Sequence, residues 1–472
     1  MKHRFARWLH LTAMMAVLLP AITLFAPAVF DPLAPPAMAD DDDDDDDSDD
    51  NGGSAGASGG ERSGGGETQG NRVNRSGTPL INLFRQRPDR TAARSAEPAL
   101  PLQAPDEIIA TGIDASALAT LTTEGYAIAE RQVLSVLDGE VVRLILPSGT
   151  GLNEAQARIG EIAPTAETDV NHFYRPEQTA EDGGCADGTC PLVRNLIGWP
   201  EAPLLTEDRC GPLPRIGMID TAINPDHDAL RSARLTVIGI GDGSLPASSR
   251  QHGTAVAALL VGAKDSRAPG LLPGSELIAV DAFRRVSKRA DLASAFDLVK
   301  ALDILASREV RVINLSLSGP TNRLVERTIA RLVDNRTIIV AAVGNHGPKA
   351  PPLYPAAYAG VIAVTAIDRR FGVFRRANQG PHVDIAAPGV NVWTAASVAG
   401  ARPKTGTSFA APFVSAAAAL LLARDPGLGP QEVKTALSAM TRDIGLPGKD
   451  PVFGWGVLEA QGLCADHAIG RE

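Results

Sequence analysis

Three residue types at wide spacing in this sequence have the chemistry of nucleophilic catalysis. Asp220 ends the apolar run RIGMID, His252 is the second residue of QHGTAVAALLVG, and Ser408 opens SFAAPFVSAAAALL. A serine hydroxyl is a poor nucleophile at neutral pH, so it needs a base to take its proton and a third group to orient that base. Each residue alone is also typical of a cap, a turn or a structural histidine, so the hypothesis depends on their joint occurrence.

The sequence beyond residue 200 has the pattern that is typical of a parallel sheet. Amphipathic stretches such as NRLVERTIARLV and ADLASAFDLVKALDILA separate short apolar runs, which are RIGMID, ELIAVDAF, VRVINLSLS, TIIVAAVGN and GVIAVTAI. This alternation predicts an α/β fold whose mainly parallel sheet is covered by helices on both faces. Sites in such sheets form at the carboxyl ends of strands, where Asp220, Asn314, Ser316 and Asn345 are expected.

Several segments in this region resemble the motifs of subtilisin-like serine peptidases, whose catalytic residues follow the chain order aspartate, histidine, serine. The resemblance covers roughly residues 210–460 and is carried by IGMIDTAINPDH, QHGTAVAALLVG, INLSLSG, AAVGNHG and GTSFAAPFVSAAAALL. It implies a serine endopeptidase that works through an acyl-enzyme, with Asp220, His252 and Ser408 as the triad. Asn345 and the Ser408 N–H, at the start of a buried helix, would stabilise the oxyanion. The alternative is a catalytically silent binding or surface protein that keeps the same fold.

The resemblance also implies a peptide-binding cleft. The segment that would pair with an extended substrate is Ser316, Leu317, Ser318 and Gly319, and the wall of the primary specificity pocket would be Ala342, Val343 and Gly344. An internal strand end is the alternative for the first segment. His346 lies outside the family pattern and is interpreted as a surface residue. We expect no cofactor. The resemblance leaves structural Ca²⁺, which many family members hold, as an open alternative whose ligands cannot be located residue by residue in this sequence.

The first hundred residues are expected to lie outside the folded region. Residues 1–39 combine a basic, an apolar and a small-residue segment, which predicts a signal peptide and export to the cell envelope, as a periplasmic or extracellular protein. An uncleaved membrane anchor is the alternative. Residues 40–103 are acidic and then rich in Gly, Ser and Pro, which predicts a disordered spacer. Because the formal charge of −10 matches the aspartates of residues 40–50, the remainder is near neutral and lacks a nucleic-acid-binding surface.

Residues 104–176 show strand and helix signals in the order βαββαβ, with a hairpin signal at Asp138-Gly139. This order predicts a small ferredoxin-like α+β domain. By its position it resembles the family's inhibitory propeptide, whose tail lies in the active cleft; a permanent accessory domain is the alternative. A zymogen would cut itself between about Tyr174 and Cys210. The expected partners are therefore peptide or protein substrates and the propeptide itself.

The four cysteines predict disulfides in an exported protein. Residues 177–209 are expected to form a linker that contains Cys185 and Cys190, and residues 210–472 the catalytic domain with Cys210 and Cys464. Three pairings are possible, of which the short Cys185–Cys190 loop is the easiest to close and would leave Cys210 with Cys464. A zinc site is the weaker alternative, because the spacing is not of the paired CxxC kind.

Overall fold

The computed structural model describes residues 100–177, 193–200, 205, 207–241, 243, 245–287 and 290–464. The predictions of a signal peptide and of a Cys185–Cys190 disulfide lie outside these residues, as does the predicted spacer up to residue 99; its predicted end at residue 103 is one residue too late, because strand β1 begins at Gln103. Every described residue belongs to one unit of the chain, Ala93–Glu472.

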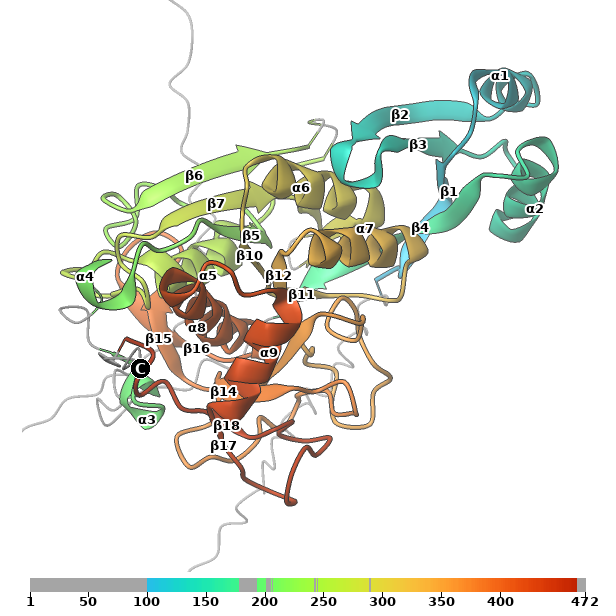
Figure 1. Cartoon of the computed structure of the whole chain (residues 1–472). Coiled ribbons are helices and arrows are strands. Elements are labelled where there is room, and N and C mark those ends of the chain that lie inside the picture. Colours follow the sequence, from blue (N-terminus) through green and yellow to red (C-terminus); the bar gives the residue numbers. More distant parts are fainter. Residues whose placement is uncertain are drawn as a thin grey trace, which may run out of the picture. The chain divides into compact units, whose positions relative to one another are not determined.

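A nine-stranded sheet in the order β17-β18-β14-β13-β12-β10-β5-β7-β6 forms the centre of the predicted catalytic domain, residues 210–472, hereafter the catalytic region (Figure 1). Its strands are β5 Ile216–Asp220, β6 Arg234–Gly239, β7 Glu276–Asp281, β10 Val312–Leu315, β12 Ile338–Ala342, β13 Ile362–Ile367, β14 Ile385–Pro388, β17 Thr441–Arg442 and β18 Val457–Leu458. Neighbouring strands are parallel from β18 to β6, and β17 pairs antiparallel with β18. The central strands β5, β10, β12 and β13 are buried along their whole length, which explains their continuous apolar sequences.

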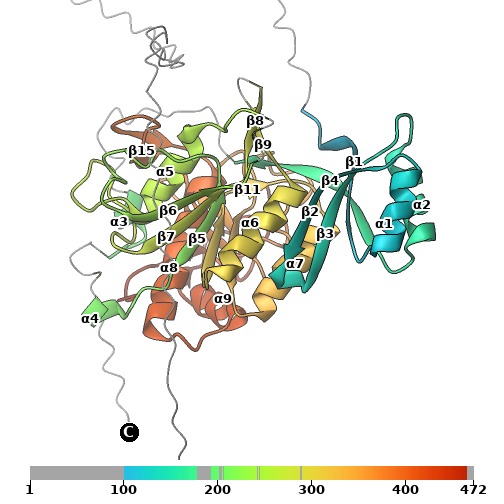
Figure 2. The same ribbon diagram turned by 90° about the horizontal axis from the view of Figure 1, so that it is seen from above.

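Helices cover both faces of this sheet, as the sequence predicts. α5 (Arg250–Val261) packs with α8 (Ala411–Arg424), and α6 (Ala295–Ser307) packs with α7 (Arg323–Asp334) (Figure 2). α8 contacts β10, β12, β13 and β14, and its small side chains allow that close approach. The segment Thr407–Arg424 is long and apolar enough to cross a membrane, but 94% of it is buried, so it is a core helix. The C-terminal helix α9 spans Pro430–Ala439.

The helix predicted within ADLASAFDLVKALDILA begins later than the apolar pattern suggests. Ala290–Ser294 forms strand β9, which pairs with β8 (Arg284–Ser287). α6 starts at Ala295 because the Ser294 side chain caps it, accepting a 3.1 Å hydrogen bond from the Asp297 N–H. Strand pairing and this cap together override the helical periodicity of the first residues.

The α+β region has the predicted order βαββαβ. Its elements are β1 Gln103–Thr111, α1 Ala115–Thr123, β2 Ala127–Leu134, β3 Gly139–Ile145, α2 Leu152–Ile162 and β4 Glu167–Pro176. The β2–β3 connection ends at Asp138, whose φ of 51° is left-handed and suits the predicted hairpin. α1 and α2 share one apolar cluster with one face of the sheet, whereas Ile109, Leu134 and Val141 on the other face join the core of the catalytic region.

Strand β4 belongs to both regions. Its first half pairs with β1, and its last residues pair with β9 and with β11 (Leu317–Ser318). The N-terminal turns of α6 and α7 also bind side chains of this strand: the Phe296 N–H donates to Asn171 Oδ1 at 3.2 Å, and the Arg323 N–H donates to Asp169 Oδ2 at 2.7 Å. A carboxylate at a helix N-terminus is stabilised by the free N–H groups and the helix dipole.

A disulfide joins α4 (Glu207–Cys210) to the end of the described chain. Cys210 and Cys464 are bonded across a sequence separation of 254 residues, as one of the possible pairings requires. Replacing both cysteines with alanine is expected to lower the free energy of unfolding by about 2–4 kcal/mol, because the bond restricts the unfolded chain. Denaturant unfolding in a Ser408→Ala background, which removes self-digestion, measures the change. Equal unfolding midpoints with and without the cysteines would contradict it.

Candidate active site

Asp220 and His252 are in direct contact at the carboxyl edge of the central sheet. Asp220 is the last residue of β5, and His252 lies in the first turn of α5. His252 Nδ1 lies 2.6 Å from Asp220 Oδ1, and both side chains are 1% exposed. Asp220 Oδ1 also accepts the Thr221 N–H at 2.7 Å, which fixes the carboxylate. The contact assigns the imidazole proton to Nδ1, so Nε2 is the basic nitrogen.

Gly253 explains how α5 approaches the end of β5 so closely. A Cβ atom at this position would lie 2.3 Å from the carbonyl oxygen of Thr221. The Gly253 N–H donates instead to Thr221 Oγ1 at 2.9 Å, which ties the first turn of α5 to the residue after Asp220. Any larger residue at 253 would push His252 away from its carboxylate.

Ser408 lies in a short 3₁₀ turn, Thr407–Phe409, directly before α8. The turn lies beside the imidazole, since the rings of Phe409 and His252 are 5.6 Å apart. Ser408 Oγ donates a hydrogen bond to the carbonyl oxygen of Glu177 and lies 3.5 Å from that of Ser316. The hydroxyl is therefore directed at the backbone where β4 ends, and His252 Nε2 has no hydrogen-bond partner among the described residues.

The amide of Asn345 is oriented by the residue before the serine. Asn345 Oδ1 accepts hydrogen bonds from the Thr407 N–H at 3.0 Å and from Thr407 Oγ1 at 3.1 Å. Its Nδ2 is buried and, within the described part of the chain, has no partner. Buried donors and acceptors are normally satisfied. Asn345 and His252 contact the two sequence neighbours of Ser408 through other atoms, so their unpaired nitrogens indicate where a reacting group binds.

A chain of buried hydroxyl and amide groups fixes the Ser408 backbone. Ser316 Oγ donates to the Ser408 carbonyl oxygen at 2.9 Å and accepts from Asn314 Nδ2 at 2.9 Å. Asn314 Oδ1 in turn accepts from Ser415 Oγ of α8 at 2.9 Å. The end of β10 and the beginning of α8 are thus held together at the serine.

The cleft beside Ser408 holds β4 as a peptide between two strands. On one side, Leu317 and Ser318 of β11 pair antiparallel with Pro176 and Arg175, in the segment predicted to bind substrate. On the other side, Ala293 and Ser294 of β9 pair with Tyr174 and Phe173. Sequence reasoning missed this second wall. The Ser-x-x-Asp cap at residues 294–297 is the signal that separates the strand from the helix.

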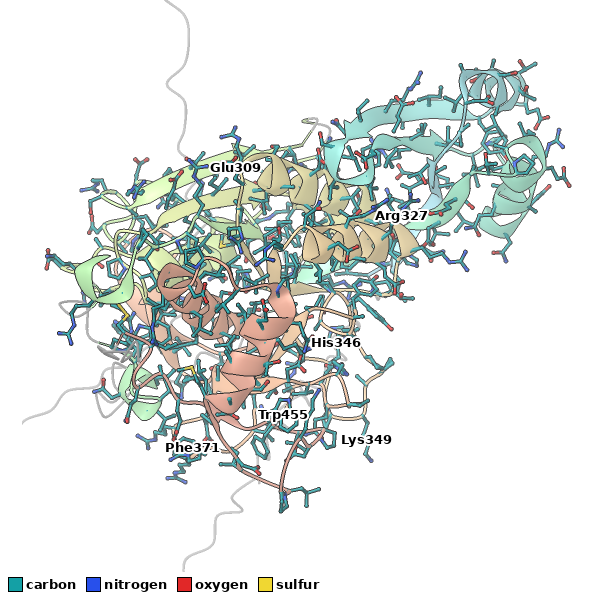
Figure 3. All side chains as sticks on the ribbon, viewed as in Figure 1. Glu309, Arg327, His346, Lys349, Phe371 and Trp455 are labelled. Atoms are coloured by element: carbon teal, nitrogen blue, oxygen red, sulfur yellow. A yellow bond between two sulfur atoms is a disulfide. The ribbon has the colours of Figure 1, made fainter. Side chains whose placement is uncertain are left out.

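The remaining predicted residues lie around the same cleft. Ala342, Val343 and Gly344 are buried where β12 ends, and the Gly344 N–H donates to Thr407 Oγ1 at 3.2 Å. Their role in a specificity pocket stays a prediction. His346 is 48% exposed, in agreement with a surface position, but its Nε2 lies 3.8 Å from Glu177 Oε1 (Figure 3). Glu177 and Thr407 are site residues that the sequence analysis did not select.

His227 has a structural role. Its Nδ1 accepts the Ala229 N–H at 3.0 Å and its Nε2 donates to the Gly400 carbonyl at 3.0 Å, so both ring nitrogens are used. Among the residues that the structure describes, no cluster of three His, Cys, Asp or Glu side chains could hold a metal ion.

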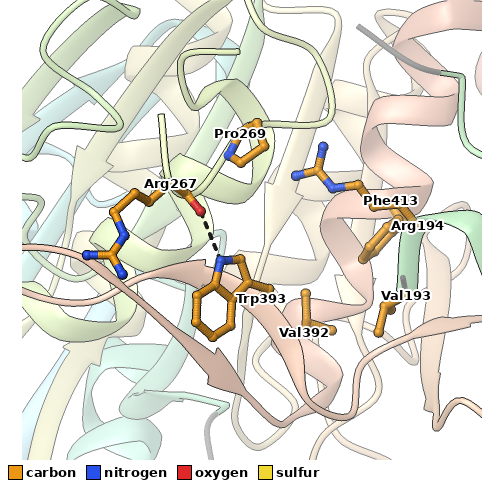
Figure 4. Close-up of a pocket in the computed structure, with 7 residues that line it drawn as sticks. All are labelled: Val193, Arg194, Arg267, Pro269, Val392, Trp393 and Phe413. Atoms are coloured by element: carbon orange, nitrogen blue, oxygen red, sulfur yellow. Dashed lines mark hydrogen bonds between the residues drawn. The ribbon is translucent and has the colours of Figure 1, made fainter. Parts of the chain in front are cut away.

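A second cavity, of about 150 Å³, is lined by Val193, Arg194, Arg267, Pro269, Val392, Trp393 and Phe413 (Figure 4). Trp393 Nε1 donates to the Arg267 carbonyl at 2.9 Å, and Arg194 donates to the Gly270 carbonyl at 2.9 Å. Burial lowers the pKa of the Arg194 guanidinium to about 10, so the group stays charged at neutral pH. None of the predicted site residues lines this cavity, so the cleft beside Ser408 is the candidate active site.

Comparisons with known proteins give matches to the part of the chain that contains this cleft. A family model described as "Subtilase family" matches residues 213–456, about half of the chain. The minor extracellular protease Epr of Bacillus subtilis (strain 168) is 29% identical over 260 residues, which are 54% of this chain and 39% of Epr. Subtilisin DY of Bacillus licheniformis is 28% identical over 236 residues, which are 49% of this chain and 84% of that protein.

A solved structure shares the fold. The crystal structure of fervidolysin from Fervidobacterium pennivorans, described as a keratinolytic enzyme related to subtilisin, matches with a TM-score of 0.64. The match covers 77% of this chain and 61% of fervidolysin at 19% sequence identity. At this identity the match supports a shared fold and says nothing about activity or substrates.

Proposed function

Because the chain belongs to the subtilase family, we propose that it is a serine endopeptidase that hydrolyses peptide bonds through an acyl-enzyme. One observation carries the proposal. The His252 ring and Asn345 Oδ1 contact the residues on each side of Ser408 in sequence, His252 Nε2 and Asn345 Nδ2 have no partner among the described residues, and the Ser408 hydroxyl bonds to a backbone carbonyl in the cleft. A base, an oxyanion donor, a nucleophile and a peptide therefore meet at one point.

In the acylation step, Ser408 Oγ attacks the carbonyl carbon while His252 Nε2 takes the hydroxyl proton. The Asn345 amide and the Ser408 N–H, at the start of α8, stabilise the negative oxygen. His252 then gives its proton to the leaving amine as the C–N bond breaks. Asp220 keeps Nδ1 protonated and stabilises the imidazolium, without taking the proton itself.

In the deacylation step, water attacks the ester carbon and His252 Nε2 takes a proton from it. When the ester bond breaks, this proton returns to Ser408 Oγ and the new carboxyl end of the peptide leaves. The oxyanion donors act again in this step. No cofactor is required by the sequence of proton transfers.

The α+β region then serves as a propeptide that inhibits its own catalytic domain. Its last strand, β4, lies between β9 and β11 as an extended substrate would, so it denies the cleft to other peptides. A parallel sheet with many long-range contacts folds slowly, which gives a folded template a physical role. The basic and apolar segments of residues 1–39 support export to the cell envelope or beyond.

Labelling with a fluorophosphonate probe tests the proposal. The probe bonds covalently to an activated serine, so matured wild-type protein should be labelled and should cut an unfolded protein substrate. The Ser408→Ala variant is the control and should show neither effect. A matured protein that binds peptides but takes no label would instead be a catalytically silent binding protein.

A further inference from the structure

Glu177 occupies the position of the residue before a cleaved bond, an assignment that rests on the proposed function. Its N–H donates to the Ser316 carbonyl at 3.2 Å, which continues the pairing of β4 with β11. Its own carbonyl oxygen accepts a hydrogen bond from Ser408 Oγ. The bond that follows this carbonyl in the sequence is Glu177–Gln178.

The Glu177 side chain lies in a pocket of hydrogen-bond donors. The side chain is 3% exposed, and both of its oxygens have partners. Oε2 accepts the Asn345 N–H at 2.8 Å, Oε1 accepts from Ser318 Oγ, and His346 Nε2 lies 3.8 Å from Oε1. Burying a carboxylate is costly unless it is hydrogen-bonded, so this pocket meets the condition for taking an acidic group.

The loop that carries two of these groups is itself fixed. The His346 N–H donates to Asn378 Oδ1 at 2.8 Å, and the Asn378 N–H donates to the Gly344 carbonyl at 3.0 Å. Asn378 Nδ2 is also bonded to the Pro351 carbonyl at 3.1 Å. Because these bonds hold the backbone of the loop, the Asn345 N–H and the backbone of His346 keep their places when no acidic side chain is bound.

We propose that this pocket selects glutamate at the residue before the cleaved bond, and that the chain matures by cutting after Glu177. Ser318, His346 and the backbone N–H of Asn345 are the selecting groups. A leucine would leave the Asn345 N–H and the Ser318 hydroxyl buried without partners. A lysine would place its ammonium against an N–H and an imidazole, and a glutamine would lose the charge.

The residues before Glu177 define the remaining sequence of a test peptide substrate. Tyr174 is fully buried, and a Cβ at Gly319 would lie 2.6 Å from its ring. Tyr174 Oη donates to the Pro320 carbonyl at 3.1 Å. Test peptides should therefore keep Tyr-Arg-Pro, residues 174–176, in front of the varied position.

The first experiment measures kcat/KM of the matured wild-type enzyme on Tyr-Arg-Pro-Xaa peptides with Glu, Gln, Leu or Lys at Xaa. Glu should exceed Gln by about tenfold or more, the size of one hydrogen bond to a charged group, and Leu and Lys should be cut more slowly still. Equal rates for Glu and Gln, or a faster rate for Leu, would overturn the pocket proposal while peptide cleavage and fluorophosphonate labelling persist. Loss of both cleavage and labelling would refute the proposed function, and the pocket proposal with it.

The second experiment removes the selecting groups. Ser318→Gly and His346→Ala should each lower the Glu-to-Gln ratio severalfold. Lys349→Ala is the matched control, because Lys349 is an exposed cation on the same loop, and its ratio should equal that of the wild type (Figure 3). Unchanged ratios in both pocket variants would contradict the assignment.

The third experiment uses the full chain. N-terminal sequencing of the matured wild type should begin at Gln178. Glu177→Leu should slow this cut by about tenfold or more, for the same reason as in the peptides. A mature N-terminus elsewhere, or equally fast cutting of Glu177→Leu after position 177, would overturn the maturation site.

Discussion

Ser408→Ala is expected to lower kcat by about a millionfold, which is the order known for the corresponding loss in subtilisin itself. The full chain should then accumulate with the α+β region still attached. The physical reason is that Ser408 provides the only hydroxyl proposed to attack the carbonyl carbon. Without it, His252 has no proposed nucleophile to deprotonate, and no covalent intermediate forms for Asn345 to stabilise. What activity remains would come from oxyanion stabilisation and binding alone.

The measurement is electrophoresis and N-terminal sequencing of Ser408→Ala beside the wild type. The control adds matured wild-type enzyme to the purified Ser408→Ala chain. Because the variant keeps the Glu177–Gln178 bond, the added enzyme should cut it and release the same N-terminus. A Ser408→Ala chain that matured at the wild-type rate on its own would show that the serine is not the nucleophile.

Five strands of the sheet, β5, β7, β10, β12 and β13, were predictable because each is a local apolar signal, whereas β6, β14, β17 and β18 were not predicted. β5, β10, β12 and β13 are short and buried on both faces, so their apolar runs are continuous and visible without any partner. The polar residues that end them, such as Asp220, then lie at one edge by the geometry of a parallel sheet. The structure places His252, in the first turn of α5, in contact with Asp220 at this edge.

The cleft was not predictable in the same way, because it depends on pairings between distant segments. β9 spans Ala290–Ser294 and becomes a strand through contact with β8 and β4, although its sequence continues smoothly into the helix α6. Glu177 carries no motif at all. Its importance appears when β4 pairs with β11 and brings its carbonyl to Ser408, across a sequence separation of 231. Contacts between segments that are distant in sequence decide whether such residues form a strand and where they lie.

The role of Thr407 was not predictable from sequence either, because it depends on how the Asn345 side chain is oriented. It orients the Asn345 amide through two hydrogen bonds and accepts a third from the Gly344 N–H. The motif GTS places it beside the serine, but a residue list cannot show which atom of Asn345 it holds. The sequence identifies Asn345 as a donor, and the structure shows why its Nδ2 is the free end.

Asp220→Asn is expected to lower kcat by about ten-thousandfold with little change in KM. The carboxylate oxygen accepts the His252 Nδ1–H at 2.6 Å and the Thr221 N–H at 2.7 Å. An asparagine amide group turned toward the ring would donate to Nδ1 and move the proton to Nε2, which could then no longer accept the proton of Ser408. The cleft strands β9 and β11 do not contain Asp220, so peptide binding should persist.

Asp281→Asn is the matched control for this change. Asp281 pairs in register with Asp220 on the neighbouring strand β7, and its carboxylate accepts hydrogen bonds from Ser248 and the Phe283 N–H. Burial raises the pKa of Asp281, and these hydrogen bonds go to Ser248 and Phe283 and not to the imidazole. Steady-state kinetics on one peptide should show a loss at least about a hundredfold smaller than for Asp220→Asn. If the two variants lost activity equally, the effect would come from disturbance of the sheet edge, and Asp220 would not act through the imidazole.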